Sequence, residues 1–178
     1  PYACSGLTAF SALKKIPNTS VDDWIIIIGA GGVGINGILL SPAVHKAKIL
    51  VIDNDKEKRE KAIEAGADQA FSPTDDDKIR KLIGIGAVAT IDFVGRPETT
   101  DLGLSLVKKG GMVIVVGLYG GSLKMSLPLV PMRSITLRGS YVGELRELKE
   151  LVDIIKSGKI KLIPCLLYTS DAADELCR

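Results

Sequence analysis

The sequence has no long apolar run, few cysteines and almost no net charge. No apolar stretch approaches the roughly 20 residues that a transmembrane helix needs, and the chain does not open with the basic and then apolar segments of a signal peptide. Its three cysteines lack the spacing of a disulfide scaffold. With 23 lysines and arginines against 21 acids, the formal net charge of +2 argues against nucleic acid or a membrane surface as the main partner. We therefore expect a cytoplasmic protein that binds neither.

The remaining composition is typical of a globular domain. Apolar residues make up 46% and charged residues 25% of the chain. Its 178 residues are enough for one sizeable domain with a core and too few for two ordinary ones.

The two ends of the sequence are unusual. The first residue is proline rather than methionine, and residues 165–175 read CLLYTSDAADE, which follows no helix or strand period. That stretch resembles the translated read-through of a sequencing adapter. We therefore expect a gene fragment cut on both sides, with residues 165–178 as a non-native tail that takes no part in the fold.

Helix and strand signals alternate from residue 20 onward. A strand is predicted at 24–28, an unbroken apolar, β-branched run that ends at glycine. Further strands are predicted at 48–52, 69–71, 87–94, 111–116 and 135–140. Helices are predicted at 5–15, 34–44, 55–65, 75–83, 97–107 and 144–156. Residues 124–132 contain two prolines and are expected to be irregular. This alternation predicts an α/β fold with a doubly wound parallel sheet of six strands and helices on both faces.

The strongest motif is IIIIGAGGVG at residues 25–34, which places G-x-G-x-x-G directly between a strand and a helix. Gly29 permits the tight turn, Gly31 lets the backbone approach a pyrophosphate, and Gly34 lets helix and strand pack closely. The helix N-terminus then offers free N–H groups to the phosphates.

An acid follows the second predicted strand, where a dinucleotide-binding fold needs one. Asp53 lies 19 residues after Gly34, and its carboxylate can accept hydrogen bonds from both ribose hydroxyls while repelling a 2′-phosphate. The pair of signals predicts NAD rather than NADP. Two other interpretations stay open: a strand-end turn former, and the S-adenosylmethionine site of a methyltransferase, whose loop usually lacks the third glycine.

Five stretches together resemble the medium-chain dehydrogenase/reductase superfamily, and most of all its zinc-dependent alcohol dehydrogenase branch. They are CSGLTAFSALKK, GAGGVG, VIDNDKEKREKAIEAGAD, DFVGR and GGMVIVVGLYG. The resemblance implies that residues 20–164 form an NAD-binding Rossmann domain with strand order 3-2-1-4-5-6, and that residues 1–19 form a helix linking it to a catalytic domain. It also implies hydride transfer between NAD and an alcohol or carbonyl substrate, with zinc in the intact parent enzyme.

The resemblance carries cofactor roles onto single positions. It implies a phosphate loop with a nicotinamide contact at Val33, ribose contacts at Asp53 and Lys58, an adenine side, and backbone reaching the nicotinamide carboxamide. The residues are, in that order, Gly29, Gly31, Gly32, Val33 and Gly34; Asp53 and Lys58; Val94, Gly95 and Arg96; and Gly117, Leu118 and Val142. For Lys58 a solvated helix lysine, and for the valines a place in the core, are the alternatives.

The resemblance also implies roles at the start of the chain. Thr8 matches a residue that touches the nicotinamide ring, and Cys4 matches one protein ligand of the catalytic zinc. In a helix over residues 5–15, Cys4 and Thr8 would share one face, so that thiolate and hydroxyl would point into one cleft. The only histidine, His45, falls in the wrong place for the family's histidine ligand and is expected at the surface. Because catalytic zinc needs three protein ligands, we expect the chain alone to be inactive.

Two other functions remain open. One is a zinc-independent NAD(P)H quinone or enoyl reductase of the same superfamily, and the other is an NAD-sensing module without catalysis. The strand at 135–140 is expected at the sheet edge, where pairing with a second copy would form a homo-oligomer.

Overall fold

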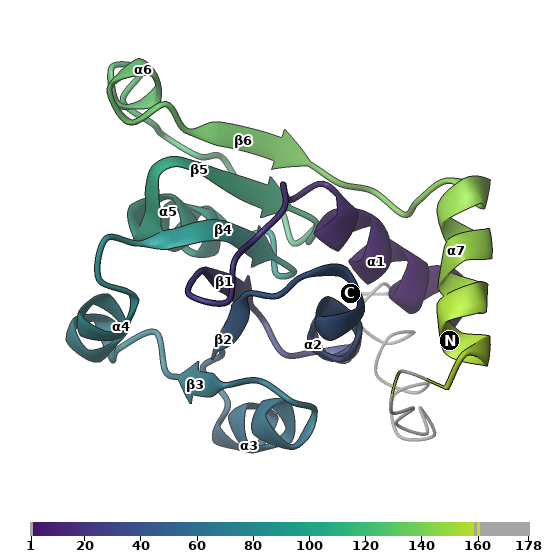
Figure 1. Ribbon diagram of the computed structural model, residues 1–178. Helices are drawn as coiled ribbons and strands as arrows, with labels where there is room; N and C mark the ends of the chain where they lie inside the picture. Colours follow the sequence, from purple (N-terminus) through teal and green to yellow (C-terminus); the bar gives the residue numbers. More distant parts are fainter. Residues whose placement is uncertain (1, 159, 161–178) are drawn as a thin grey trace.

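A computed structural model describes residues 2–158 and 160. Its centre is a parallel sheet of six strands in the order β3-β2-β1-β4-β5-β6 (Figure 1). The strands are β1 (Trp24–Ile28), β2 (Lys48–Ile52), β3 (Gln69–Phe71), β4 (Ala87–Asp92), β5 (Val107–Val115) and β6 (Thr136–Gly139). All five neighbouring pairs are parallel. The predicted fold class and strand order are therefore confirmed.

Helices follow the strands and lie on both sides of the sheet (Figure 1). They are α1 (Leu7–Lys14), α2 (Gly32–Val44), α3 (Lys56–Glu64), α4 (Asp76–Ile83), α5 (Pro97–Leu106), α6 (Leu129–Arg133) and α7 (Leu145–Lys156), with a π-helical turn η1 at Tyr2–Gly6 before α1. No helix within the described residues is long and apolar enough to cross a membrane.

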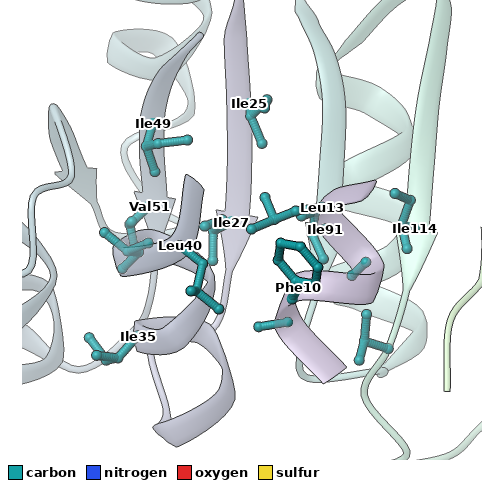
Figure 2. Close-up of a cluster of buried hydrophobic side chains, with 14 of the residues drawn as sticks. Phe10, Leu13, Ile25, Ile27, Ile35, Leu40, Ile49, Val51, Ile91 and Ile114 are labelled. Carbon is teal, nitrogen blue, oxygen red and sulfur yellow. The ribbon is translucent and has the colours of Figure 1, made fainter. Parts of the chain in front are cut away.

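The core forms two layers because successive strand side chains point to opposite faces. Ile25 and Ile27 of β1 belong to the larger cluster, which also takes in side chains of α1, α2 and α7. Figure 2 shows Phe10 and Leu13 of α1 close to Ile27. Their neighbours Ile26 and Ile28 face the second cluster, beneath α4 and α5. A strand that is apolar on both faces needs both layers, which explains the unbroken apolar run in β1.

Several boundaries differ from those predicted. Helix α2 begins at Gly32, two residues before the predicted start, because Gly31 has an extended backbone and is the N-cap. Strand β4 ends at Asp92 rather than at residue 94, and β5 begins at Val107 rather than at residue 111. The segment expected to be irregular contains the short helix α6, whose N-cap is Pro128 and whose inner Pro131 lies in the first turn, where proline removes no helical hydrogen bond. The proposed tail, 165–178, lies outside the described residues.

The expectation that His45 lies at the surface is wrong. Only 8% of the residue is exposed. Its Nε2 lies 2.9 Å from the carbonyl oxygen of Leu13, near the end of α1. Helix α1 packs on α2, and the last carbonyls of a helix need donors from outside it. The imidazole is therefore buried as a structural link between two helices.

Candidate functional site

The loop between β1 and α2 has a different steric demand at each glycine. Gly29 has a φ of +91°, a conformation that side chains other than glycine rarely adopt. A Cβ atom at position 34 would lie 1.9 Å from the carbonyl oxygen of Gly29, so only glycine allows α2 this close to β1. At positions 31 and 32 a Cβ atom would meet nothing within 4 Å. The protein itself therefore leaves open space over these two residues, at the N-terminus of α2, where phosphate binding is expected.

Asp53 follows β2 and lies beside this loop. Its Oδ2 accepts a hydrogen bond of 2.7 Å from the N–H of Ala30, and its Oδ1 accepts one of 2.9 Å from the N–H of Asp55. Only 8% of the residue is exposed. Each carboxylate oxygen keeps a second lone pair, so the group can still accept hydrogen bonds from a ligand. The end of β2 and the glycine loop are thereby fixed to each other, as the dinucleotide hypothesis requires.

The turn after Asp53 contains a cation that the sequence analysis missed. The guanidinium of Arg59 donates hydrogen bonds to the carbonyl oxygens of Asp53 and Asn54, at 2.8 and 2.9 Å. Its position, one turn into α3 and six residues after the acid, was the available signal. The ammonium of Lys58, the residue implied as a ribose contact, makes no hydrogen bond or ion pair with any described residue, and Lys58 is half-buried. Arg59 stabilises the turn, while the role of Lys58 stays a prediction.

The residues implied for the adenine and nicotinamide sides come together at the ends of β4 and β5. The Val94 side chain lies against the glycine loop, since a Cβ atom at Gly29 would be 2.7 Å from its Cγ2. Beyond it, an open groove of about 340 Å³ is lined by several of the predicted residues. They are Gly95, Arg96, Gly117 and Leu118. Sequence reasoning missed Asp92, which accepts hydrogen bonds from the backbone N–H groups of this region; its signal was an acid at the end of a buried apolar strand.

Val142 follows β6 with a backbone that a β-branched residue rarely adopts. Its φ is +53°, in the left-handed region. The next residue, Gly143, approaches α1 so closely that a Cβ atom there would lie 2.8 Å from Leu7 Cδ1. Such conformations persist only where the surrounding packing enforces them, and they concentrate at functional sites.

Thr8 and Cys4 are joined by a hydrogen bond, but not through the thiol. The Thr8 hydroxyl donates to the carbonyl oxygen of Cys4 at 2.8 Å. Cys4 is a free, exposed cysteine in the η1 turn. The turn lies beside α2, with Asn36 Nδ2 3.4 Å from Ser5 Oγ. The Thr8 hydroxyl thus reaches the backbone of Cys4 near the end of α2 that carries the glycine loop, while the shared face of thiol and hydroxyl stays a prediction.

The described residues do not complete a metal site. They contain no group of three or more histidine, cysteine, aspartate or glutamate side chains placed to hold an ion. A catalytic zinc site needs three protein ligands, and Cys4 supplies one. Within the part of the chain that the structure describes, the residues present do not fit zinc by themselves.

Charged contacts join α7 to α1 beside the site. Lys14 and Glu150 form an ion pair. Burial lowers the pKa of Lys15, whose ammonium lies 2.7 Å from Ser11 Oγ. Partial burial acts to raise the pKa of Glu147, but the N–H of Glu144, the Ser11 hydroxyl and Lys15 outweigh it and hold this pKa below its ordinary value. These contacts fix α1, with Thr8, against the rest of the domain.

Comparison with known proteins agrees with this geometry. The family model described as "Zinc-binding dehydrogenase" matches residues 32–157. The chain belongs to this family. It is 34% identical to an NAD-dependent alcohol dehydrogenase of Sulfolobus acidocaldarius over 180 residues, which cover 99% of the chain and 52% of that protein. The chain thus spans about half the length of the curated relatives it matches.

Two solved structures of similar proteins match this zinc-binding dehydrogenase domain. The alcohol dehydrogenase of Aeropyrum pernix superimposes with a TM-score of 0.83 at 30% identity, covering 92% of this chain and 48% of that one. Acetophenone reductase of Geotrichum candidum, solved with NAD, gives 0.80 at 31% identity, covering 91% and 46%. The chain therefore corresponds to about half of each of these two proteins and shares the fold of that half.

Proposed function

We propose that the chain binds NAD and holds it for hydride transfer between an alcohol and the corresponding carbonyl compound, as the cofactor domain of a zinc-dependent alcohol dehydrogenase. The observation that carries the choice of NAD is the buried carboxylate of Asp53, fixed 2.7 Å from the N–H of Ala30 at the glycine loop. A carboxylate there accepts hydrogen bonds from ribose hydroxyls and repels a 2′-phosphate. The guanidinium of Arg59, in the turn after Asp53, donates to backbone carbonyls.

We infer that these residues fit NAD, because the space over Gly31 and Gly32 is open at the N-terminus of α2 and the Asp53 carboxylate binds the preceding residue of the same loop, Ala30. When bound, the nicotinamide supplies the hydride acceptor. The backbone at Gly31 and Gly32 would hold the pyrophosphate, and Asp53 would hold the adenosine ribose. The residues that we assign to the remaining contacts are Val94, Gly95 and Arg96 for adenine, Val33 and Thr8 for the nicotinamide ring, and Gly117, Leu118 and Val142 for its carboxamide.

We propose only one of the protein ligands of the zinc. Cys4, exposed beside the N-terminal end of α2, is the one residue here that we propose as a ligand. Three protein ligands and one open position are needed for Lewis-acid catalysis, so the other ligands would come from outside the described residues. The substrate class, alcohols and their carbonyl products, is proposed from the named relatives.

Titration of the purified chain with NADH and NADPH, followed by nicotinamide fluorescence, tests the cofactor. We expect NADH to bind and NADPH to bind at least about tenfold more weakly, because the 2′-phosphate would meet the Asp53 carboxylate. Equal binding of the two would contradict the assignment. With NAD and a panel of alcohols we expect no turnover, and steady turnover would show that the residues present suffice for catalysis.

A homodimer through β6 is our proposal for assembly. All four residues of β6 are exposed, and one edge of the strand is unpaired within the described sheet. Large apolar side chains lie exposed nearby, namely Leu127, Leu129, Met132 and Leu137. An open edge flanked by apolar side chains favours pairing with a second copy.

A further inference from the structure

The two loops that follow β4 and β5 are joined by one buried acid. Asp92 is fully buried. Its Oδ1 accepts hydrogen bonds of 2.9 Å from the N–H groups of both Val94 and Gly95. Its Oδ2 lies 2.8 Å from the hydroxyls of Thr99 and Thr100, at the start of α5. Four donors satisfy this carboxylate, which offsets the cost of burying its charge.

The backbone carbonyl of the same residue binds the other loop. It accepts hydrogen bonds from the N–H groups of Val116, at 2.9 Å, and Gly117, at 3.0 Å. One residue therefore holds the 94–96 segment through its side chain and the 116–119 segment through its main chain. We call these two segments together the double loop.

Further contacts close the double loop. A Cβ atom at Gly95 would lie 2.0 Å from the carbonyl oxygen of Gly117, so the two backbones touch. The N–H of Tyr119 donates to the carbonyl of Val94 at 3.3 Å. On the outside, the Arg96 guanidinium stacks over the Tyr119 ring, 3.5 Å from its centroid, in a cation–π arrangement. Neither segment can shift without moving the other.

We propose that Asp92 is a positioning residue that makes the adenine side and the nicotinamide side of the cofactor site one rigid unit, with the Arg96–Tyr119 stack as its outer clasp. This proposal rests on the proposed function, which places Val94 and Arg96 at the adenine and Gly117 and Leu118 at the carboxamide. As a consequence, binding at the adenine side is coupled to binding at the nicotinamide side. Damage to the double loop at the adenine side weakens the hold on the nicotinamide as well.

Comparing two ligands distinguishes the binding contributions of the two ends of the site. ADP-ribose carries everything in NADH except the nicotinamide. The dissociation constant of ADP-ribose divided by that of NADH therefore measures how much the nicotinamide contributes to binding. The emission of bound NADH reports the surroundings of the ring directly. Both are measured on the full 178-residue chain.

We expect Asp92→Asn to weaken NADH binding by at least about tenfold, because it removes two of the four acceptor interactions in a buried site. ADP-ribose binding falls less, so the ratio shrinks, and the emission of bound NADH moves toward that of free NADH. Tyr119→Ala, at a residue that is 69% exposed and thus safe for folding, shrinks the ratio by about two- to fivefold. Tyr119→Phe keeps the ring and restores the wild-type ratio.

The matched control is Thr90→Val, in the same strand. Thr90 is also fully buried, and its hydroxyl has no hydrogen-bond partner among the described residues, so the wild-type ratio is expected. If Asp92→Asn fails to fold, Tyr119→Ala decides. Equal losses for NADH and ADP-ribose, with unchanged emission, would overturn the coupling and leave the proposed function intact. Failure of the wild-type chain to bind NADH would overturn the proposed function and this inference with it.

Discussion

The Cα of Gly34 faces the carbonyl oxygen of Gly29 so closely that a Cβ atom would lie 1.9 Å from it. We expect Gly34→Ala to lower the free energy of unfolding by about 1–3 kcal/mol or more, because α2 must move away from β1. Urea unfolding followed by circular dichroism measures this. NAD binding is expected to fall in parallel, since the helix N-terminus moves with the helix.

Gly31→Ala is the matched comparison and should lower NAD affinity without a comparable loss of stability. No atom lies within 4 Å of a Cβ at this position, and the backbone is extended, as any residue allows. The loss of unfolded-state freedom and the weaker N-cap oppose each other, so stability should change by less than about 1 kcal/mol. NAD affinity should nevertheless fall at least about tenfold, because the methyl group fills the place proposed for the pyrophosphate. Unchanged affinity would refute that placement.

Asp53→Ala should weaken NAD binding about 10- to 100-fold, because charge-assisted hydrogen bonds to the ribose contribute roughly 1.5–3 kcal/mol each. Isothermal titration calorimetry gives the affinity. Asp68→Ala is the control: this carboxylate also accepts a 2.7 Å hydrogen bond from a strand N–H, that of Ile49, but it precedes β3 and has no proposed ligand. Equal losses in both variants would point to general destabilisation instead of ribose binding.

Stability should fall in acid through Asp23. The N–H of Ser20, and then Lys108, hold the pKa of this carboxyl below its ordinary value. The unfolded chain therefore takes up the proton first, and the contribution of Asp23, complete above about pH 5, is lost as the pH falls below about 4. Melting temperatures between pH 6 and pH 3 should decline more steeply for the wild type than for Asp23→Asn.

Asp22→Asn removes one charge from the same turn but leaves the hydrogen bonds of Asp23 to Ser20 and Lys108 in place, and it should keep the wild-type slope. Parallel melting curves for the wild type and Asp23→Asn would rule out the contribution of Asp23.

The open edge at β6 gives a prediction on assembly. We expect the chain to sediment as a dimer at micromolar concentration and Leu137→Lys to make it monomeric, because a charge on an edge strand blocks pairing. Leu137 is 44% exposed, and Ile63, 47% exposed in α3, offers the same substitution beside β3 at the opposite edge of the sheet. Ile63→Lys should remain dimeric. A wild-type chain that sediments as a monomer would contradict the proposed pairing.

Local patterns were enough to predict the sheet. The first three strands were predicted with the observed boundaries, and the central two, β1 and β2, are mostly apolar runs between polar turns. The glycine loop and Asp53 were equally visible, since their function depends on spacing along the chain. The packing consequence predicted for Gly34 is confirmed by the distance to Gly29.

What the sequence did not reveal depends on contacts between distant segments. His45 is buried because Leu13, 32 residues earlier, supplies its acceptor. The left-handed backbone of Val142 contradicts the preference of its own side chain, so only packing against the start of α1 can enforce it. The proposed role of Asp92 depends on contacts with the segments after both β4 and β5, which the sequence does not place side by side.

The contact between α1 and α7 has a consequence during synthesis. Lys14 and Glu150 are 136 positions apart, and the fully buried Leu151 of α7 belongs to the same apolar cluster as Leu7 of α1. The part of the apolar side of α1 that packs on α7 therefore stays uncovered on the ribosome until almost the whole described domain has been translated, whereas the part that packs on α2 can be covered early. Parallel strands and contacts between distant residues form slowly. Apolar surface that stays exposed on an incompletely folded chain promotes aggregation. Among the described helices, α7 is thus the one that completes the cover over α1.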